Sequence, residues 1–103
     1  MNYTVQFSPE AQDQLDELEA FITVAASPVT AANYVDAIVT YCESLKTFPE
    51  RGTRRDDLFP GLRIISYHRR AVITFLVDTP ACTVSILGVF YGGQDYSLND
   101  LNK

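Results

Sequence analysis

The spacing of apolar residues changes twice along this chain of 103 residues, and the changes restrict the folds open to it. Residues 3–7 alternate apolar and polar side chains, which is the period of a half-buried strand. Residues 9–45 carry apolar side chains three and four positions apart, which is the period of amphipathic helices. Residues 62–91 return to the period of strands. The pattern predicts an α+β fold with the element order β-α-α-β-β-β.

Two Ser-Pro pairs mark the starts of the two helices. In Ser8-Pro9 and again in Ser27-Pro28, the serine hydroxyl can accept an N–H of the first turn, and the proline lacks the N–H that would be left unpaired there. The connection between the helices is short, so we expect an antiparallel helical hairpin. The apolar stripes expected to face the core are Ala11, Leu15, Leu18, Ile22 and Ala25 on the first helix, and Ala31, Val35, Ile38, Cys42 and Leu45 on the second.

Three later strands are separated by tight turns and predict an antiparallel meander. They span residues 62–67, 71–77 and 82–91, and the second is apolar on both sides, which places it in the middle. The strand of residues 3–7 joins an edge of the sheet, and the sequence leaves open which edge. Residues 49–61 are expected to form a polar loop.

Two helices can cover only one face of such a sheet. We therefore expect an antiparallel sheet with the N-terminal helical hairpin packed on one face and an open face available to a partner. Hydrophobic residues make up 47% of the chain, enough for a core, and the length is typical of one domain. Residues 1–96 are predicted to form that domain and residues 97–103 a polar tail.

Charge is distributed unevenly along the chain, whose 13 acids and 8 bases give a net charge of −5. Residues 1–45 hold seven acids and no base, whereas residues 46–70 hold seven of the eight bases and three acids. A free-standing nucleic-acid binder of this size is usually basic, because neutralised phosphates supply most of its affinity. Direct nucleic-acid binding is therefore disfavoured, and the basic segment is better suited to an acidic protein partner.

Several other classes find little support in the sequence. No apolar run approaches the roughly 18–20 residues of a membrane span, and the first residues lack the features of a signal peptide, so a cytoplasmic protein is expected. Cys42 and Cys82 are expected to be reduced and packed. His68 is the only histidine and falls in a predicted turn, and no motif for a metal, a phosphate or a nucleophile is present. We therefore assign no catalytic residue, no metal ligand and no cofactor.

Metal-free RNA cleavage remains the alternative among enzyme activities. It needs a base, an acid and cations that hold the phosphate as charge develops. The last strand, however, contains no basic residue, and none follows until Lys103, which makes an enzyme less favoured than a protein that acts by contact. The conceivable members of such a site are Arg63, Arg69, Arg70, and Tyr91 or Tyr96.

Two features suggest a docking surface, and each has a structural alternative. Tyr34, Tyr41 and Phe48 recur every seven residues beside the stripe of the second helix, where they provide either additional core contacts or an exposed aromatic surface. Residues 54–57 have the sequence Arg-Arg-Asp-Asp, which forms either a salt-bridged loop or a group of arginines that captures carboxylates of a partner. The sequence leaves both pairs of alternatives open.

Five segments, in order along residues 3–96, resemble the ParE toxins of bacterial type II toxin–antitoxin modules, which belong to the ParE/RelE superfamily. Each segment is short, and the specificity comes from their number and order. The segments are residues 5–11 (VQFSPEA), 31–35 (AANYV), 45–56 (LKTFPERGTRRD), 61–63 (GLR) and 86–95 (ILGVFYGGQD).

The resemblance implies a toxin with the fold derived above. Such a toxin inhibits DNA gyrase by protein contact, arrests growth, serves plasmid stability and is neutralised by a cognate ParD-like antitoxin. The related RelE branch instead cleaves messenger RNA on the ribosome as a metal-free endoribonuclease, which is one alternative, and an inactive interaction module is another. Gly88 and Tyr91 stand where ParE-like sequences often carry Arg and His, and the basic catalytic set of the RelE branch has no counterpart after Phe90.

Two sets of site residues follow as hypotheses. The antitoxin of such modules contributes an acidic, amphipathic segment that folds on its toxin, and an aromatic and basic surface suits it. The residues predicted to bind the antitoxin are Tyr34, Tyr41, Phe48, Arg51, Arg54, Arg55 and Arg63. The residues predicted to contribute to toxicity are Arg63, Tyr67, Tyr91, Gln94 and Asp95.

Overall fold

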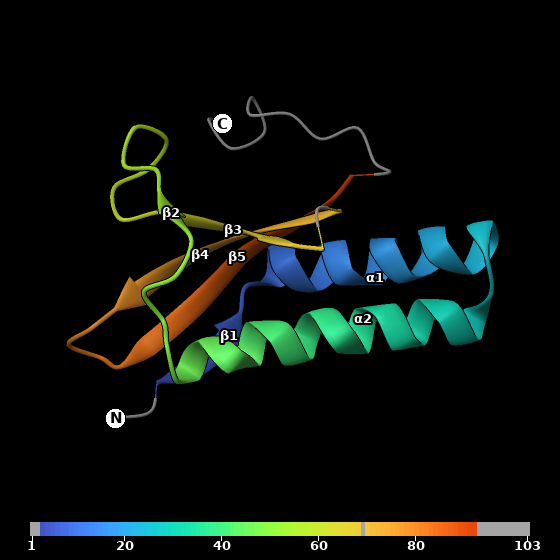
Figure 1. Ribbon diagram of the computed structural model, residues 1–103, viewed down its shortest axis with the longest axis horizontal. Coiled ribbons are helices and arrows are strands. Elements are labelled where there is room, and N and C mark those ends of the chain that lie inside the picture. Colours follow the sequence, from blue (N-terminus) through green and yellow to red (C-terminus); the bar gives the residue numbers. More distant parts are fainter. Residues whose placement is uncertain (1–2, 69, 93–103) are drawn as a thin grey trace.

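The computed structural model describes residues 3–68 and 70–92, which form two layers with both helices on one face of a sheet (Figure 1). The predicted α+β fold with a helical hairpin on one face is confirmed. Residues 97–103, together with Arg69, Gln94, Asp95 and Tyr96, lie outside the described residues. The elements are β1 (Thr4–Phe7), α1 (Pro9–Ala25), α2 (Pro28–Glu43), the 3₁₀ turn η1 (Ser44–Lys46), β2 (Thr53–Arg54), β3 (Arg63–Tyr67), β4 (Ala71–Asp78) and β5 (Thr83–Tyr91).

Both helices begin at the residues that the sequence predicts. The hydroxyl of Ser8 accepts a hydrogen bond at 3.0 Å from the N–H three residues later, and Pro9 is the first residue of α1. Ser27 accepts in the same way at 3.1 Å, and Pro28 is the first residue of α2. Each serine thus satisfies an N–H that has no partner within its helix.

The described strands pair in the order β1-β5-β4-β3-β2, so β4, the strand predicted for the middle of the meander, is central. β1 lies beside β5 and runs parallel to it, with Thr4 opposite Thr83 and Phe7 opposite Ile86. The expectation of a purely antiparallel sheet is therefore wrong: the sheet is mixed. The physical reason is that α1 and α2 carry the chain from one edge of the sheet to the other, and a long crossover permits parallel neighbours where a tight turn does not.

The segment of residues 49–61, expected to be a loop, contains the two-residue strand β2. Thr53 pairs with Ile64, and Arg54 pairs with Arg63. Two residues are too few to show an alternating pattern, and both side chains are exposed, so the sequence does not indicate this strand. The pairing places Arg54 and Arg63 next to each other across the two strands.

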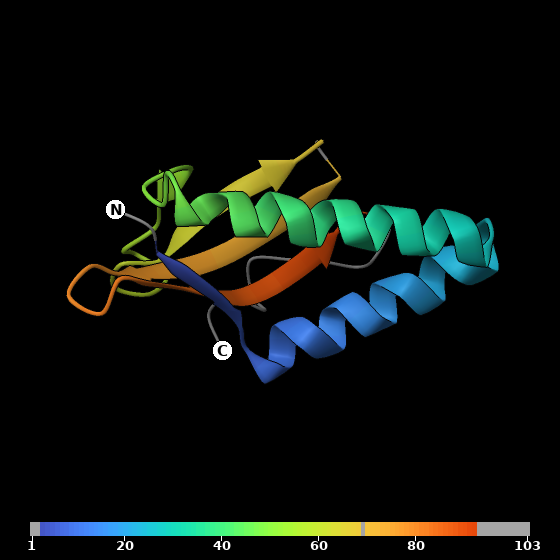
Figure 2. The same ribbon diagram turned by 90° about the horizontal axis from the view of Figure 1, so that it is seen from below.

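The core lies between the sheet and the two helices, and Figure 2 shows α2 crossing in front of the strands. The two predicted stripes are buried there except for Ala25, which is exposed, and Val35, which is half-buried. Ala25 ends α1 where the helical hairpin extends past the ends of the strands. In the described part of the chain, no helix is long and apolar enough to cross a membrane. The buried core residues of β4 and β5 are Ala71, Ile73, Phe75, Val84, Ile86 and Val89.

The first half of α1 also holds the second half of β5, which continues beyond the end of β1. The Ser8 hydroxyl donates to the Leu87 carbonyl at 3.1 Å, and the Val89 N–H donates to Gln14 Oε1 at 2.7 Å. β1 pairs with β5 only as far as Ile86. Side chains of α1 and of its cap therefore satisfy backbone groups at an edge of β5 that β1 does not reach.

Candidate functional site

Aromatic rings form a chain of contacts between the helices and the sheet. Tyr67 of β3 contacts Tyr34 and Tyr41 of α2, with ring centroids 6.2 and 5.0 Å apart. Tyr34 also contacts Tyr91 of β5 at 5.6 Å, and Tyr91 contacts Phe21 of α1 at 5.9 Å. Tyr34 and Tyr41 are half-buried and pack against the core, so these two residues of the seven-residue series provide core contacts.

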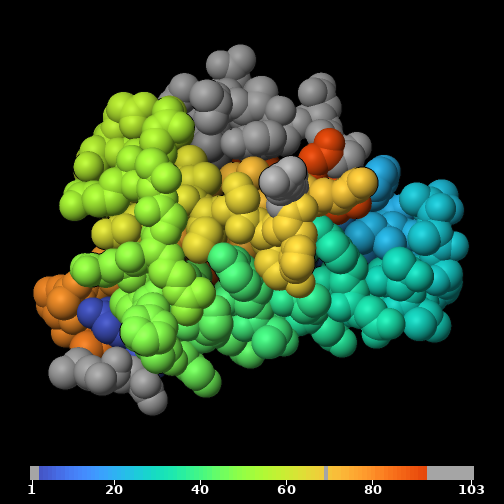
Figure 3. Space-filling view, in the orientation of Figure 1, coloured from blue at the N-terminus to red at the C-terminus, as the bar shows by residue number. Residues whose placement is uncertain are grey.

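An open groove of about 570 Å³ lies between α2 and β3, beside these rings. In Figure 3 the green surface of α2 and the yellow surface of β3 lie against each other. Tyr41 and Tyr67 give the groove aromatic surface. The polar residues that line it are Asn33, Asp36, Thr40 and Ser44.

Two arginines lie at the end of this groove, where α2 runs into η1. The Arg51 guanidinium donates to the Ser44 carbonyl at 2.9 Å, to the Ser44 hydroxyl at 3.2 Å and to the Phe48 carbonyl at 2.9 Å. Arg63 Nη1 donates to the Arg51 carbonyl at 3.3 Å. Neither arginine makes an ion pair with a residue that the structure describes. Both positive charges are thus positioned by neutral acceptors and are not neutralised by them.

Phe48 adds an exposed ring at the same end of the groove. Its side chain is 68% exposed, and the Arg51 guanidinium lies 5.9 Å from the ring centre. For Phe48 the alternative of an exposed aromatic surface therefore holds. The structure brings Phe48, Arg51 and Arg63 together, with Tyr41 and Tyr67 further along the groove.

Arg54 and Arg55, by contrast, are paired within their own loop. Arg54 lies 3.1 Å from Asp56, and Arg55 donates two hydrogen bonds to Asp57, at 3.0 and 2.8 Å. The pKa of Asp56 is lowered mainly by a hydrogen bond from the Gly61 N–H and, to a smaller extent, by one from Arg54. The hydrogen bond from Arg55 lowers the pKa of Asp57. Of the two alternatives for this segment, the structure adopts the salt-bridged loop, which offsets the charge of both arginines locally.

The residues predicted to contribute to toxicity fall into two groups. Tyr67 and Tyr91 lie in the chain of aromatic rings, and Arg63 lies at the end of the groove, whereas Gln94 and Asp95 are outside the described residues. The hydroxyl of Tyr34, whose ring contacts both tyrosines, is buried without a hydrogen-bond partner among the described residues, and burial raises its pKa. Within the described ranges, no group of His, Cys, Asp and Glu side chains could hold a metal ion.

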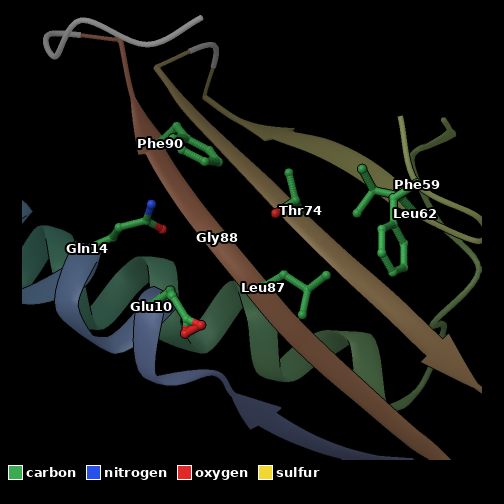
Figure 4. Close-up of a pocket in the computed structure, with 8 residues that line it drawn as sticks. All are labelled: Glu10, Gln14, Phe59, Leu62, Thr74, Leu87, Gly88 and Phe90. Carbon is green, nitrogen blue, oxygen red and sulfur yellow. The ribbon is translucent and has the colours of Figure 1, made fainter. Parts of the chain in front are cut away.

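The face of the sheet opposite the helices carries a separate hollow of about 380 Å³ (Figure 4). Thr74 and Gly88 form part of its floor, because they alternate with Phe75 and Val89, which face the core. The sequence predicts an open face here, but none of the lining residues is among the predicted site residues. The available signal was Phe59, an aromatic residue inside a polar loop. The lining residues are Glu10 and Gln14 from α1, Phe59 and Leu62 from the loop before β3, Thr74 from β4, and Leu87, Gly88 and Phe90 from β5.

Residues 5–96 match the sequence model of a family described as the ParE toxin of the type II toxin–antitoxin system parDE. This chain belongs to the ParE toxin family. The resemblance inferred from the five sequence segments is thereby confirmed, and the chain is a toxin of a type II toxin–antitoxin system. No curated protein sequence matches the chain.

Several solved structures share the fold of this ParE toxin, including two from toxin–antitoxin systems. One is a chain of the chromosomal ParDE toxin–antitoxin system from P. aeruginosa, with a TM-score of 0.74 and 22% sequence identity, over 86% of this chain and 95% of that one. The other is a chain of the toxin–antitoxin complex RelBE2 from Mycobacterium tuberculosis, with a TM-score of 0.64 and 22% identity, over 88% of this chain and 99% of that one. At these identities the likeness establishes the fold alone.

Gly88 lines the hollow on the uncovered face of this ParE toxin without contributing a side chain. A Cβ at this position would lie 2.9 Å from the Phe90 ring and 3.0 Å from Thr74 Oγ1. Both separations are too short for an ordinary contact, so a side chain would have to displace Phe90 or Thr74. The glycine therefore allows close packing and leaves this part of the floor uncharged.

The two cysteines of this ParE toxin are expected to differ sharply in reactivity. Cys42 is fully buried, and its burial, together with the charge of Glu43, raises its pKa to about 12, so it carries almost no thiolate at pH 8. Cys82 lies in the turn before β5 and is only half-buried, which corrects the expectation of two packed thiols. A thiol reagent at pH 8 should label one cysteine per native chain and both in denaturant. In a Cys82→Ser variant, rapid labelling of the native chain would contradict this assignment.

Proposed function

We propose that this ParE toxin arrests growth by binding DNA gyrase, and that a ParD-like antitoxin neutralises it by binding the groove between α2 and β3. Family membership supports the role as a toxin. The chemistry of the two surfaces supports the assignment of the partners. A toxin that acts by protein contact needs no catalytic residue, and none is assigned to this chain.

The observation that carries the antitoxin site is the pair of arginines at the end of the groove. Carbonyl groups orient the guanidinium groups of Arg51 and Arg63 but leave their charge uncompensated by any described residue. An acidic antitoxin segment supplies carboxylates, which arginine binds in a bidentate manner. Apolar residues of the same segment can pack on Phe48 and Tyr41, as an amphipathic helix does in a groove.

Gyrase is favoured over messenger RNA as the target because of the chemistry of the uncovered face. A site that cleaves RNA must hold a phosphate with cations while negative charge develops. Among the described residues that line the hollow, Glu10 is the only charged one, and a carboxylate repels phosphate. A RelE-like, metal-free endoribonuclease remains the second candidate, since the fold is shared with a chain of a RelBE complex.

Expression without an antitoxin, followed by two assays on the purified chain, tests the proposal. We expect growth arrest, and inhibition of supercoiling by gyrase holoenzyme at concentrations that leave ribosome-bound messenger RNA intact. The same chain mixed with its antitoxin should inhibit neither reaction. Cleaved messenger RNA with unaffected supercoiling would establish the endoribonuclease, and the absence of growth arrest would indicate an inactive interaction module.

A further inference from the structure

The hollow on the uncovered face is lined mainly by apolar side chains. Leu62 and Thr74 at its floor are 4% and 2% exposed, whereas Phe59 at its rim is 52% exposed. Leu87 and Phe90 add further apolar surface. Its volume of about 380 Å³ is at the lower end of the roughly 300–1,000 Å³ found for ligand pockets, which suits an inserted side chain better than a whole helix.

The charge at the rim of this hollow is acidic. Glu10 and Gln14 lie one turn apart on α1, and Glu17 follows on the same side of the helix. Glu10 is exposed and makes no ion pair with a described residue. Phe59 lies on the opposite rim, and its N–H donates to the carbonyl of Arg55, whose guanidinium is bonded to Asp57. A cation that arrives beside the hollow therefore meets the exposed Glu10 carboxylate, which forms no ion pair with a described side chain.

We propose that the toxin binds its target protein at this hollow. The hollow accommodates an apolar side chain of the target, and lysine or arginine residues flank that side chain in the target. This inference rests on the proposed function, in which the target is DNA gyrase. The acidic antitoxin does not suit the site, because its carboxylates would approach Glu10 and Glu17. A second copy of the chain does not suit it either, because each copy has the same acidic rim and a net charge of −5.

The antitoxin groove and this hollow then divide the binding functions between two faces of one sheet. The groove lies on the helical side, where Tyr67 and Tyr41 are in contact, and presents the unneutralised charges of Arg51 and Arg63. The hollow lies on the other side and presents Glu10 beside apolar residues. Partners of opposite charge are thus expected on the two faces, which makes the two sites separable by mutation.

Two single variants of the full chain test the hollow. Phe59→Glu places a charge on its apolar rim, and Glu10→Lys reverses the charge that would attract the target. Both residues are exposed, so both variants should keep the thermal midpoint of unfolding within a few degrees of the wild type. We expect each to raise the toxin concentration that half-inhibits gyrase holoenzyme by at least tenfold, to relieve growth arrest, and to leave the affinity for the antitoxin unchanged.

Matched controls separate a local effect from a general one. Val29→Glu makes the same kind of change at a side chain that is 70% exposed and lies at the start of α2, away from the hollow. Asp16→Lys makes the same charge change as Glu10→Lys on a different side of α1. Both controls should inhibit gyrase and arrest growth like the wild type.

Three outcomes would overturn the inference. If both test variants inhibit gyrase and arrest growth like the wild type, the hollow does not bind the target. Lost antitoxin affinity with full toxicity would make it an antitoxin contact, and altered self-association in sedimentation would make it a contact between copies. If the wild type arrests growth without inhibiting gyrase, the identity of the target in the proposed function fails, while relief of arrest in both variants still supports the hollow.

Discussion

Replacing Arg63 by glutamate is expected to weaken antitoxin binding by about 30- to 100-fold. Losing one partner of a hydrogen-bonded charge pair within an interface costs about 2–5 kcal/mol, and the lower end of that range applies because Arg63 is only half-buried. A carboxylate at this position would also repel the acidic segment that the groove is proposed to bind. The change is measured as the dissociation constant for the antitoxin by titration calorimetry, with the thermal midpoint of each variant recorded alongside.

Arg54→Glu is the matched control for this prediction. Arg54 lies next to Arg63 across β2 and β3, but its charge is already paired with Asp56. The Arg54 side chain is also more than half exposed, and exposed ion pairs contribute only about 0–1 kcal/mol. We therefore expect Arg54→Glu to weaken the affinity for the antitoxin by less than about fivefold. Equal losses for the two variants would show that only the net charge matters, and unchanged affinity for Arg63→Glu would exclude the proposed groove.

Replacing Gly52 by alanine is expected to lower the free energy of unfolding by about 2–5 kcal/mol. Gly52 has φ +76°, which costs a side-chain-bearing residue about 1–2 kcal/mol. An added Cβ would also overlap the Ile64 carbonyl oxygen, and relief of such overpacking costs about another 1–3 kcal/mol. Because Gly52 joins Arg51 to β2, the same change should displace the arginines at the end of the groove.

Gly61→Ala separates the two contributions. Gly61 has a similar φ of +81°, but an added Cβ meets only Leu76 Cδ2, at an ordinary 3.8 Å. The backbone cost alone remains, so we expect a loss of about 1–2 kcal/mol. Urea unfolding of both variants measures the difference, and a Gly52→Ala variant as stable as Gly61→Ala would disprove the close approach of Gly52 to β3.

The helices and most strands could be predicted from the sequence because their signals are local. A serine followed by proline fixes a helix start through a hydrogen bond that spans three residues, and both caps form as expected. The three meander strands and the central place of β4 follow in the same way from their alternating or continuous apolar patterns. β2 could not be predicted, because it consists of two exposed residues whose pairing depends on β3.

The candidate sites were only partly predictable, because each depends on which groups meet in space. The sequence singles out Arg51, Arg54, Arg55 and Arg63 as equals, whereas in the structure two are paired with aspartates and two are held by carbonyl groups. The series of Tyr34, Tyr41 and Phe48 likewise divides into two core contacts and one exposed ring. The role of all these residues in antitoxin binding remains a prediction.

The sequence by itself determined the fold class, the helical hairpin, the meander and, through five short segments, membership of the ParE toxin family. These features depend on periodicity, caps and ordered motifs, which act over a few residues each. Only the tertiary structure decided that β1 lies parallel to β5, which arginines keep an unneutralised charge, and that Glu10 lies beside an apolar hollow formed with Phe59 and Phe90. These features depend on contacts between residues up to 80 positions apart in the sequence. Such contacts follow from the packing of helices on a sheet, and they leave no pattern in the local sequence.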